Sequence, residues 1–476
     1  MGSKLFTSTL LLTSLASCID ANAEDKKNVL FIIVDDLRPE LNCYGASYMH
    51  TPNIDKMALD GVLFTQSYCN IPVSGASRAS LLTGLRPTQE RWWDVNASIN
   101  IETPEAITLP RYFKENGYTT ISNSKVMHDK DEARDSWSKL WMPEGKSSTW
   151  RDYLGDENLS VEKKRNGPEA FECLDVEDAA YFDGKTVQRT IEDLKNLKKN
   201  GKPFFLAVGI LKPHLPFNAP KKYWDLYDRK DIKVPETFDF DRSSFPSQAF
   251  HSWGELRYYK DIPQKADIDK ECAKNLIHGY RASVSYADAQ VGLIMDELKR
   301  LELDKNTVVI LIGDHGWSLG DHNQWCKHSN FAIVNHTPMI FMLPNDTKPK
   351  KVSEIVEFVD LYPTICEAAG LPIPDKIDGK SMVNLMTKGD TLWKDYAIVK
   401  WHWGVTYIDQ NYHYTEWRNK QDRFMANMLF SKKDIWEQNN IANDPANKEL
   451  VGKLSKELQN KRGKDFFIKV NQPNKR

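Results

Sequence analysis

A short segment from Val73 to Gly84, with the sequence Val-Ser-Gly-Ala-Ser-Arg-Ala-Ser-Leu-Leu-Thr-Gly, carries residues well suited to chemistry. Ser74 stands just ahead of an apolar helical stretch, where free backbone N–H groups and the positive end of the helix dipole favour an anion. Arg78 adds a planar guanidinium group that fits a tetrahedral oxyanion. A simpler alternative is that Ser74 caps the helix and Arg78 is exposed. This segment alone is compatible with both interpretations.

Possible metal ligands follow two apolar segments of the chain. Asp35 and Asp36 come directly after residues 28–34, and Asp314 and His315 come directly after residues 307–313. Adjacent carboxylates repel each other and are costly to bury without a cation. An oxygen-rich set of this kind suits calcium or magnesium better than zinc. A solvated Asp-Asp turn is the alternative, but a second acidic segment at the same edge of a sheet favours a metal site.

Basic residues follow the other apolar segments in the same way. They would supply cations for an anionic substrate and at least one acid or base that works near neutral pH. Taken singly, each is more often a surface lysine or a hydrogen-bonded histidine. These residues are Lys125 and His128 after residues 118–121, His214 after residues 203–210, and Lys327 after the Asp314-His315 segment.

These clusters lie at one edge of a sheet if the apolar segments are strands of that sheet. Continuous apolar strands separated by helical segments, such as 109–116 and 281–301, indicate an α/β protein with a mostly parallel sheet covered on both faces. In such sheets, ligands bind outside the carboxyl ends of the strands. We therefore expect all four clusters to converge on one site. Tyr286 and Asp288, on the second helix, are expected to be structural.

The chain changes character along its length. Residues 221–269 are irregular and rich in Pro, Asp, Tyr and Trp, which is typical of ordered loops that shape a binding surface. After about residue 380, short alternating strands at 396–403 and 412–417 are followed by a polar helix at 447–461. This pattern predicts a catalytic domain over residues 24–380 and a smaller C-terminal α+β subdomain over residues 381–476.

Composition describes a folded globular protein of 476 residues, with 41% hydrophobic residues, 14 Trp and charges of both signs. The formal net charge of −2 argues against a nucleic-acid partner bound through bulk positive charge. The seven cysteines show no metal-finger spacing and imply no disulfide framework. An anionic substrate would have to be attracted by a locally basic pocket.

The N-terminus predicts export. Met1 to Ala23 contains Lys4, an apolar stretch and Ala21-Asn22-Ala23, the pattern of a secretory signal, and its apolar run is too short to span a membrane. Leu15-Ala16-Ser17-Cys18 also resembles a bacterial lipoprotein box, in which Cys18 would carry the lipid. We expect a periplasmic protein or one anchored by lipid at the bacterial envelope, without a transmembrane segment.

Taken together, these motifs resemble the type I sulfatases, and in particular the iduronate-2-sulfatase group. The family signature, which is Cys or Ser, any residue, Pro or Ala, Ser, Arg and a short run to Thr-Gly, is matched by Ser74 to Arg78 and Leu82-Thr83-Gly84. The likeness covers most of the mature chain. It extends to residues 28–53, 113–118, 204–217, 283–292, 314–331 and 412–417.

The resemblance implies an alkaline-phosphatase-like sulfatase fold and a defined site. Ser74 would be oxidised to formylglycine, whose hydrated aldehyde is the nucleophile, because an unmodified serine would be too weak. One hydroxyl of the hydrate would attack sulfur and release the sugar alcohol, and the other would expel sulfate as the aldehyde re-forms. The metal, usually Ca²⁺ and less often Mg²⁺, would be bound by Asp35, Asp36, Asp314 and His315 together with the modified Ser74.

The same resemblance assigns the remaining catalytic and substrate-binding roles. Arg78 would orient the hydrate, and Lys125 and Lys327 would bind the sulfate oxygens. His128 and His214 would assist nucleophile recycling and leaving-group protonation, with His214 the candidate for protonating the leaving oxygen.

Two departures from the animal enzymes bear on this expectation. Ser74 replaces their cysteine, so maturation would need a bacterial radical-type enzyme that accepts serine, and Ala76 replaces the commoner proline. The loops of residues 221–269 and Trp92-Trp93 are expected to shape the sugar pocket. The substrate is then a sulfated carbohydrate, either a 2-O-sulfated uronic acid of a glycosaminoglycan or an algal polysaccharide such as ulvan. The alternatives are a phosphohydrolase of the same superfamily and a non-catalytic protein that binds sulfated glycans.

Overall fold

The computed structural model describes residues 26–344, 348–389 and 392–463. The predicted secretory signal and the lipoprotein cysteine Cys18 lie outside these residues. Among the helices of the described residues, none is both long and apolar enough to cross a membrane. The six cysteines in the described part of the chain are all free thiols.

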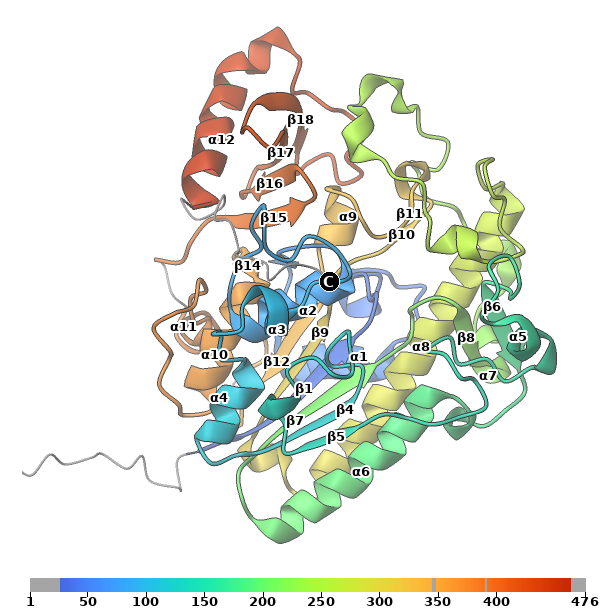
Figure 1. Ribbon diagram of the computed structural model, residues 1–476, viewed down its shortest axis with the longest axis vertical. Helices are drawn as coiled ribbons and strands as arrows, with labels where there is room; N and C mark the ends of the chain where they lie inside the picture. Colours follow the sequence, from blue (N-terminus) through green and yellow to red (C-terminus); the bar gives the residue numbers. More distant parts are fainter. Residues whose placement is uncertain (1–25, 345–347, 390–391, 464–476) are drawn as a thin grey trace, which may run out of the picture.

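An eight-stranded sheet runs through the middle of the larger part of the molecule (Figure 1). β12 pairs antiparallel with β9 and β2, whereas the other pairs in the sheet are parallel. The predicted mostly parallel sheet is thus confirmed. In spatial order its strands are β13 (Lys350–Val352), β2 (Val62–Phe64), β12 (Met339–Met342), β9 (Thr307–Gly313), β1 (Asn28–Val34), β7 (Phe204–Ile210), β4 (Thr119–Ser124) and β5 (Lys139–Trp141).

Helices cover both faces of this sheet, which is why its central strands are buried at every position and mostly apolar. On β1, Leu30 and Ile32 belong to a core shared with α1 (Pro52–Asp60), α6 (Phe182–Asn200) and α8 (Lys270–Arg300). The alternate residues Phe31 and Ile33 belong to a second core on the opposite face. That core includes α2 (Ser74–Thr83), α4 (Leu109–Glu115), α10 (Leu361–Ala368) and α11 (Val383–Thr387).

The long helix α8 begins at Lys270, well before the predicted start at residue 281. Asp269 caps it by accepting a hydrogen bond from the backbone N–H of Cys272 at 2.8 Å. Tyr286 and Asp288 have the structural roles that we expected. The Tyr286 hydroxyl accepts from the backbone of Gly184, and Asp288 accepts from the first backbone N–H groups of α1.

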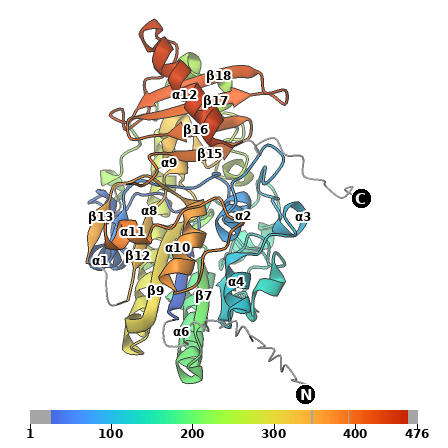
Figure 2. The same ribbon diagram turned by 90° about the vertical axis from the view of Figure 1, so that its left-hand side faces the viewer.

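The C-terminal part contains a separate four-stranded antiparallel sheet that stands beyond one end of the large sheet (Figure 2). Its strands are β15 (Ala397–Trp401), β16 (Gly404–Ile408), β17 (Tyr412–Arg418) and β18 (Phe424–Ser431), and α12 (Lys448–Lys461) covers one face. Leu454 and Leu458 of α12 pack in one cluster with Ile398, Tyr407 and Leu429. The predicted short strands and terminal helix are present, and the exact domain boundary stays a prediction.

Glu357 joins this C-terminal sheet to the rest of the chain. Its buried carboxylate accepts hydrogen bonds from the backbone N–H of Ile398 at 2.8 Å and from Asn70 at 3.0 Å. It also forms ion pairs with Arg86, at 2.5 Å, and with Lys394. Asn70 and Arg86 flank α2, so Glu357 ties both ends of the signature segment to the C-terminal sheet.

The remaining strands and helices are short. The pairs are β3 (Ser67–Tyr68) with β14 (Val356–Glu357), β6 (Phe171–Leu174) with β8 (Phe217–Pro220), and β10 (Ser318–Leu319) with β11 (Trp325–Cys326). The short helices are α3 (Ile99–Glu102), α5 (Asp156–Val161), α7 (Lys221–Trp224) and α9 (Ala332–Asn335). Residues 221–269 contain α7 and four single 3₁₀ turns, as the irregular sequence predicts.

Candidate active site

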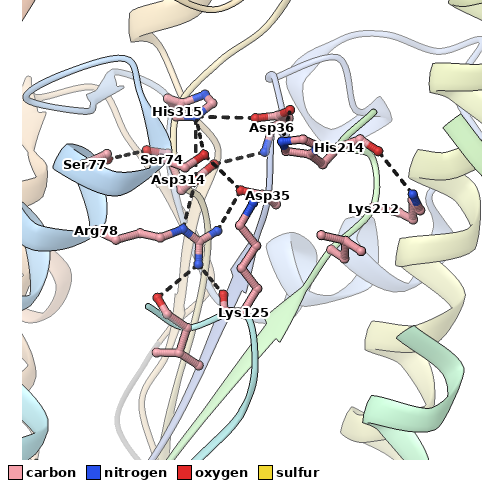
Figure 3. Close-up of polar contacts among 12 residues, drawn as sticks. Asp35, Asp36, Ser74, Ser77, Arg78, Lys125, Lys212, His214, Asp314 and His315 are labelled. Atoms are coloured by element: carbon pink, nitrogen blue, oxygen red, sulfur yellow. Dashed lines mark hydrogen bonds and ion pairs between the residues drawn. The ribbon is translucent and has the colours of Figure 1, made fainter. Parts of the chain in front are cut away.

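The carboxyl ends of β1 and β9 bring the predicted metal ligands together (Figure 3). The two strands are adjacent and in register, with Val34 opposite Gly313, so Asp35-Asp36 and Asp314-His315 leave the sheet side by side. The backbone N–H of Asp36 donates to Asp314 Oδ1 at 3.0 Å. Asp36 has a left-handed conformation with φ of 59°, which turns the chain sharply after the strand.

Ser74 lies against this cluster at the start of α2. Its hydroxyl is 3.2 Å from Asp35 Oδ1 and 2.9 Å from His315 Nε2, and the residue is 1% exposed. The N-cap of α2 is Val73, and Ser74 is the first helical residue without a capping hydrogen bond. The interpretation of Ser74 as a helix cap is therefore wrong, because its side chain faces the acidic cluster and not its own backbone.

Arg78 is fully buried, so the alternative of an exposed arginine is also wrong. One turn along α2 from Ser74, its guanidinium donates to Asp35 Oδ1 at 2.9 Å and to Asp314 Oδ2 at 3.1 Å (Figure 3). It also donates to the backbone carbonyls of Lys125 and Val126. Burial alone would lower the pKa of Arg78, but the two aspartates raise it. Arg78 is thus a fixed cation that connects three strand ends.

Lys125 and Lys327 contact different aspartates of the cluster. Lys125, after β4, forms an ion pair with Asp35, and Lys327 donates to Asp36 Oδ1 at 2.9 Å. Although burial opposes it, Asp36 raises the pKa of Lys327, which stays protonated. The backbone of Lys125 passes so close to Gly209 on β7 that a Cβ there would lie 2.2 Å from it. A glycine is therefore needed for Lys125 to reach the site.

The two predicted histidines lie at the same edge. His214 Nε2 is 3.8 Å from Asp36 Oδ2, and its Nδ1 is 2.6 Å from the carbonyl oxygen of Leu215. Burial, and then the nearby Lys125, lowers the pKa of His214 to about 4 and that of His128 to about 3. His128 is part of the site through the cavity that it lines.

Buried hydrogen bonds hold the loop that carries His214. Lys212 Nζ donates to the carbonyl oxygens of Pro216 at 2.7 Å and of His214 at 3.3 Å. The backbone N–H groups of Leu211 and Lys212 both donate to the carboxylate of Asp183, at the start of α6. The position of His214 is therefore set by the body of the fold.

The acidic cluster fits a divalent cation. Ligand atoms of Asp36, Asp314 and His315 lie within 4.8 Å of one another, as do those of Asp35, Asp36 and His214. Burial, together with the adjacent carboxylates, raises the pKa of Asp36 well above its usual range, although Lys327 opposes this. Asp36 is thus short of positive charge in the described set of residues, and a bound cation would supply it.

Glu255 is a residue of this site that sequence reasoning missed. Its Oε1 lies 3.1 Å from His214 Nε2 and 3.3 Å from Lys327 Nζ. Glu255 lies in the irregular segment of residues 221–269, where no periodic pattern or known motif distinguishes one acidic residue from another. The sequence predicts only that this segment contributes to a binding surface.

A cavity of about 1100 Å³ opens onto these residues, and we call it the central cavity. Ser74, Lys125, His128, His214 and Lys327 all line it. So do Glu255, Trp150 and much of the segment 140–150. Trp150 is 43% exposed and meets the His214 ring edge-on at 4.7 Å.

The expected sugar-pocket segments contribute less to the central cavity than predicted. Of residues 221–269, all of which the structure describes, Glu255 lines it. Trp92 is fully buried, and Trp93 packs against Trp403 with ring centres 4.7 Å apart, so neither of them lines the cavity. Trp92 belongs to the core on the α2 face of the large sheet, and Trp93 contacts the C-terminal sheet, so much of the cavity wall comes from the segment 140–150.

Comparisons with known proteins agree with this fold and site. The sulfatase family model matches residues 27–371, and the model described as N-sulphoglucosamine sulphohydrolase, C-terminal, matches residues 320–464. The chain is 34% identical to human iduronate 2-sulfatase over 436 residues, which cover 81% of this chain and 77% of that protein. It is 30% identical to a sulfatase of Formosa agariphila, with 88% of this chain and 84% of that protein covered.

A solved structure of the phosphonate monoester hydrolase from Silicibacter pomeroyi is similar in fold, with a TM-score of 0.77 and 21% identity, covering 94% of this chain and 97% of that one. The chain belongs to the sulfatase family and is a sulfuric ester hydrolase close to the iduronate-2-sulfatase group. The predicted alkaline-phosphatase-like fold is confirmed.

Proposed function

We propose that this sulfatase removes sulfate esters from a sulfated carbohydrate through a formylglycine made from Ser74. The observation that carries the proposal is the position of Ser74, whose hydroxyl lies between Asp35 and His315. Arg78 donates to the same Asp35 oxygen. A serine hydroxyl is a weak nucleophile. Oxidation to an aldehyde would supply a hydrate whose two hydroxyls stand in this charged site.

A divalent cation, Ca²⁺ in preference to Mg²⁺, would be held by Asp35, Asp36, Asp314 and His315 and by the modified residue 74. When bound, it would lower the pKa of the nucleophile and hold a sulfate oxygen. With Glu255, the three aspartates place four carboxylates beside three cations, Arg78, Lys125 and Lys327, so the site is one positive charge short. A divalent ion would therefore give the site an excess of positive charge, which favours an anionic substrate.

Arg78 would orient the hydrate, while Lys125 and Lys327 would bind sulfate oxygens. His214 and His128 would handle protons at the leaving group and at the nucleophile. All but Arg78 line the central cavity, which supports a shared role toward one substrate.

The substrate that we favour is a 2-O-sulfated uronic acid of a glycosaminoglycan, because the human relative is named for that chemistry. An algal polysaccharide such as ulvan is the second candidate. The half-exposed Trp150 on the cavity wall suits a sugar ring. We further propose that the protein is exported, to the periplasm or to a lipid anchor at Cys18, and that a maturation enzyme that accepts serine is its partner.

Mass spectrometry on protein from the native host tests the central claim. The peptide that contains Ser74 should have lost two hydrogen atoms, and an aldehyde should be trapped there. Recombinant protein made without the maturation enzyme would not test it. If the native peptide carries only unmodified serine, the formylglycine mechanism fails and a glycan-binding role replaces it.

Substrate class is tested by comparing turnover of an aryl sulfate with that of the matching aryl phosphate, followed by a set of 2-O-sulfated disaccharides and ulvan oligosaccharides. We expect the sulfate to be preferred. A clear preference for the phosphate would instead support the phosphohydrolase alternative.

A further inference from the structure

The wall of the central cavity at residues 147–150 has no regular secondary structure to hold it. Residues 142–150 lie in no helix or strand, although residues 147–150 all line the cavity. Residues 143–148 make no backbone–backbone hydrogen bond with any residue that the structure describes. An irregular segment of this kind would lose conformational freedom on meeting a ligand, unless side chains already fix its shape.

The carboxylate of Glu162, directly after α5, supplies such contacts to three consecutive wall residues. Its Oε1 accepts from the backbone N–H of Ser148 at 3.0 Å and from the Ser148 hydroxyl at 2.7 Å. Its Oε2 lies 2.5 Å from Ser147 Oγ and accepts from Thr149 Oγ1 at 3.2 Å. One side chain therefore determines the path of the wall.

The surroundings of Glu162 are unusual for a buried acid. The residue is 5% exposed, and its carboxylate forms no ion pair with another described residue. Burial alone would raise the pKa of Glu162, but the hydroxyls of Ser147 and Ser148 and the Ser148 N–H hold it below its usual value. Glu162 is therefore an ionised carboxylate whose charge is satisfied by the wall itself.

A second series of contacts leads from Glu162 to Trp150. The Tyr258 hydroxyl donates to the carbonyl oxygen of Glu162 at 3.2 Å. The guanidinium of Arg151 lies over the Tyr258 ring at 4.1 Å and over the Trp150 ring at 4.6 Å. Tyr258 belongs to the irregular segment of residues 221–269, which thus supports the wall without lining the cavity at this position.

Ser148 shows which ligand groups this wall suits. The residue is exposed and lines the central cavity. Its hydroxyl has one hydrogen, which it donates to Glu162, so its oxygen is left as an acceptor. A sugar hydroxyl can donate to this oxygen, whereas a sulfate or carboxylate oxygen has no hydrogen to donate. The wall therefore suits an unsulfated part of a carbohydrate.

We propose that Glu162 is a positioning residue that holds residues 147–150 in the shape that binds the free hydroxyls and ring face of the sugar, a role that rests on the proposed function. Ser148 accepts from a sugar hydroxyl, and Trp150 contacts the ring. Glu162 does not line the cavity and acts through these residues. Because the wall is ordered before the sugar arrives, binding does not bear the cost of ordering it.

The test compares a sugar substrate with 4-nitrophenyl sulfate, which has no sugar for the wall to bind. The sugar is a 2-O-sulfated disaccharide, or an ulvan oligosaccharide if wild-type protein turns over only that one. Glu162→Leu keeps the bulk and removes both acceptor oxygens. We expect it to raise KM for the sugar about tenfold, with kcat within about twofold of wild type. For the aryl sulfate, kcat/KM should stay within about twofold.

Glu162→Gln is the conservative variant, because its amide keeps one oxygen that Ser148 can donate to. We expect KM for the sugar to rise about threefold in Glu162→Gln, between wild type and Glu162→Leu. A double variant tests whether Glu162 acts through the wall, since effects that share a route are not independent. In Glu162→Leu/Trp150→Ala, KM for the sugar should rise about 10–30-fold, below the roughly 100-fold rise of two independent effects.

Glu172→Leu is the matched control. Glu172 is 6% exposed and accepts from the backbone N–H groups of Leu154 at 2.9 Å and Gly155 at 3.0 Å, outside the cavity lining. Its KM for the sugar should stay within about twofold of wild type. Rates are divided by the formylglycine content of each preparation, and thermal unfolding is measured on every variant.

An unchanged KM for the sugar in Glu162→Leu, an equal rise in Glu172→Leu, or an equal loss on the aryl sulfate would overturn the role of Glu162. Should Glu162→Leu fail to fold, Glu162→Gln decides the question by the presence or absence of its smaller rise in KM. Fully modified wild-type protein that hydrolyses the aryl sulfate but no sulfated sugar would overturn the sugar-binding role and leave the sulfatase class intact. Hydrolysis of neither substrate would instead overturn the proposed function itself.

Discussion

At the residue scale, Arg78 has a structural role in addition to its place in the signature. Its guanidinium binds two aspartates and two backbone carbonyls, so it joins the ends of β1, β9 and β4. A lysine has one ammonium group and cannot reproduce this planar set of donors. Arg78, which we propose orients the nucleophile, is therefore also a structural connection between strands.

Replacing this arginine by lysine should damage both catalysis and stability. We expect Arg78→Lys to lower kcat on an aryl sulfate by about 10²–10³-fold, the cost of losing an oriented donor. Loss of part of a buried ion pair should lower the free energy of unfolding by about 3–5 kcal/mol. Urea unfolding measures the second quantity, and the exposed Arg111→Lys serves as the control. A variant with wild-type kcat would contradict the expected role.

The sequence predicts the site residues best where they come directly after an apolar strand. Asp35 and Asp314 were predictable because the carboxyl ends of adjacent parallel strands meet, and the structure brings them together. Glu255 was not, because it reaches the site from a loop whose path depends on tertiary packing. The burial of Arg78 was also not predictable from the helix pattern, because it depends on the acidic cluster that the side chain contacts in the folded chain.

At the scale of elements, Glu357 on β14 connects the signature helix with the C-terminal sheet. Burial opposes its ionisation, but Arg86 and Lys394 hold its pKa at about 2. A carboxylate with a lowered pKa in the folded state stabilises the fold above its unfolded pKa of about 4.5 and loses this effect as the pH falls toward 2. This junction should therefore weaken in acid.

We expect Glu357→Gln to lower the free energy of unfolding at pH 7 by about 3–5 kcal/mol, because Arg86 loses its carboxylate partner and Lys394 keeps only Asp360. The difference from wild type should shrink as the pH is lowered from about 5 to about 2, since the wild-type carboxylate becomes protonated. Urea unfolding at several pH values measures this, with the exposed Glu367→Gln as the control. A difference that stays constant with pH would contradict it.

The segment 140–150 is the element that walls the central cavity. Trp150 presents a half-exposed ring beside His214, and Arg151 stacks on that ring at 4.6 Å. We expect Trp150→Ala to raise KM for a 2-O-sulfated disaccharide about tenfold, equivalent to about 1.4 kcal/mol. Trp436→Ala, distant from the central cavity, is the control. Unchanged KM in Trp150→Ala would place the sugar elsewhere.

Element prediction succeeded for the long strands and was incomplete for helices. β1, β7 and β9 were predictable because they are buried on both faces and each contains a continuous apolar run. The first turns of α8 were missed because residues 270–280 include several polar residues and Gly279, which interrupt the apolar pattern. Asp269, the helix cap, was the available indication. The contact of Trp93 with Trp403, which leaves Trp93 off the central cavity, could not be predicted from the sequence.

At the scale of the whole molecule, the metal site gathers residues from strands that are distant in sequence. A ligand that binds only the folded state stabilises it by mass action, by about 2.7 kcal/mol at one hundred times its dissociation constant. We expect a chelator to lower the unfolding temperature and Ca²⁺ to restore it more fully than Mg²⁺. Asp314→Asn should be insensitive to both treatments. No shift with any divalent cation would contradict the metal assignment.

All ten residues of α2 are buried, including Ser74 at its first position. A maturation enzyme of the kind proposed would have to take this peptide into its own active site, and the folded chain does not offer it. Oxidation would therefore have to come before the core closes around α2. A chain that folded first would keep its serine, so the fraction of active molecules would depend on the relative rates of maturation and folding during biosynthesis.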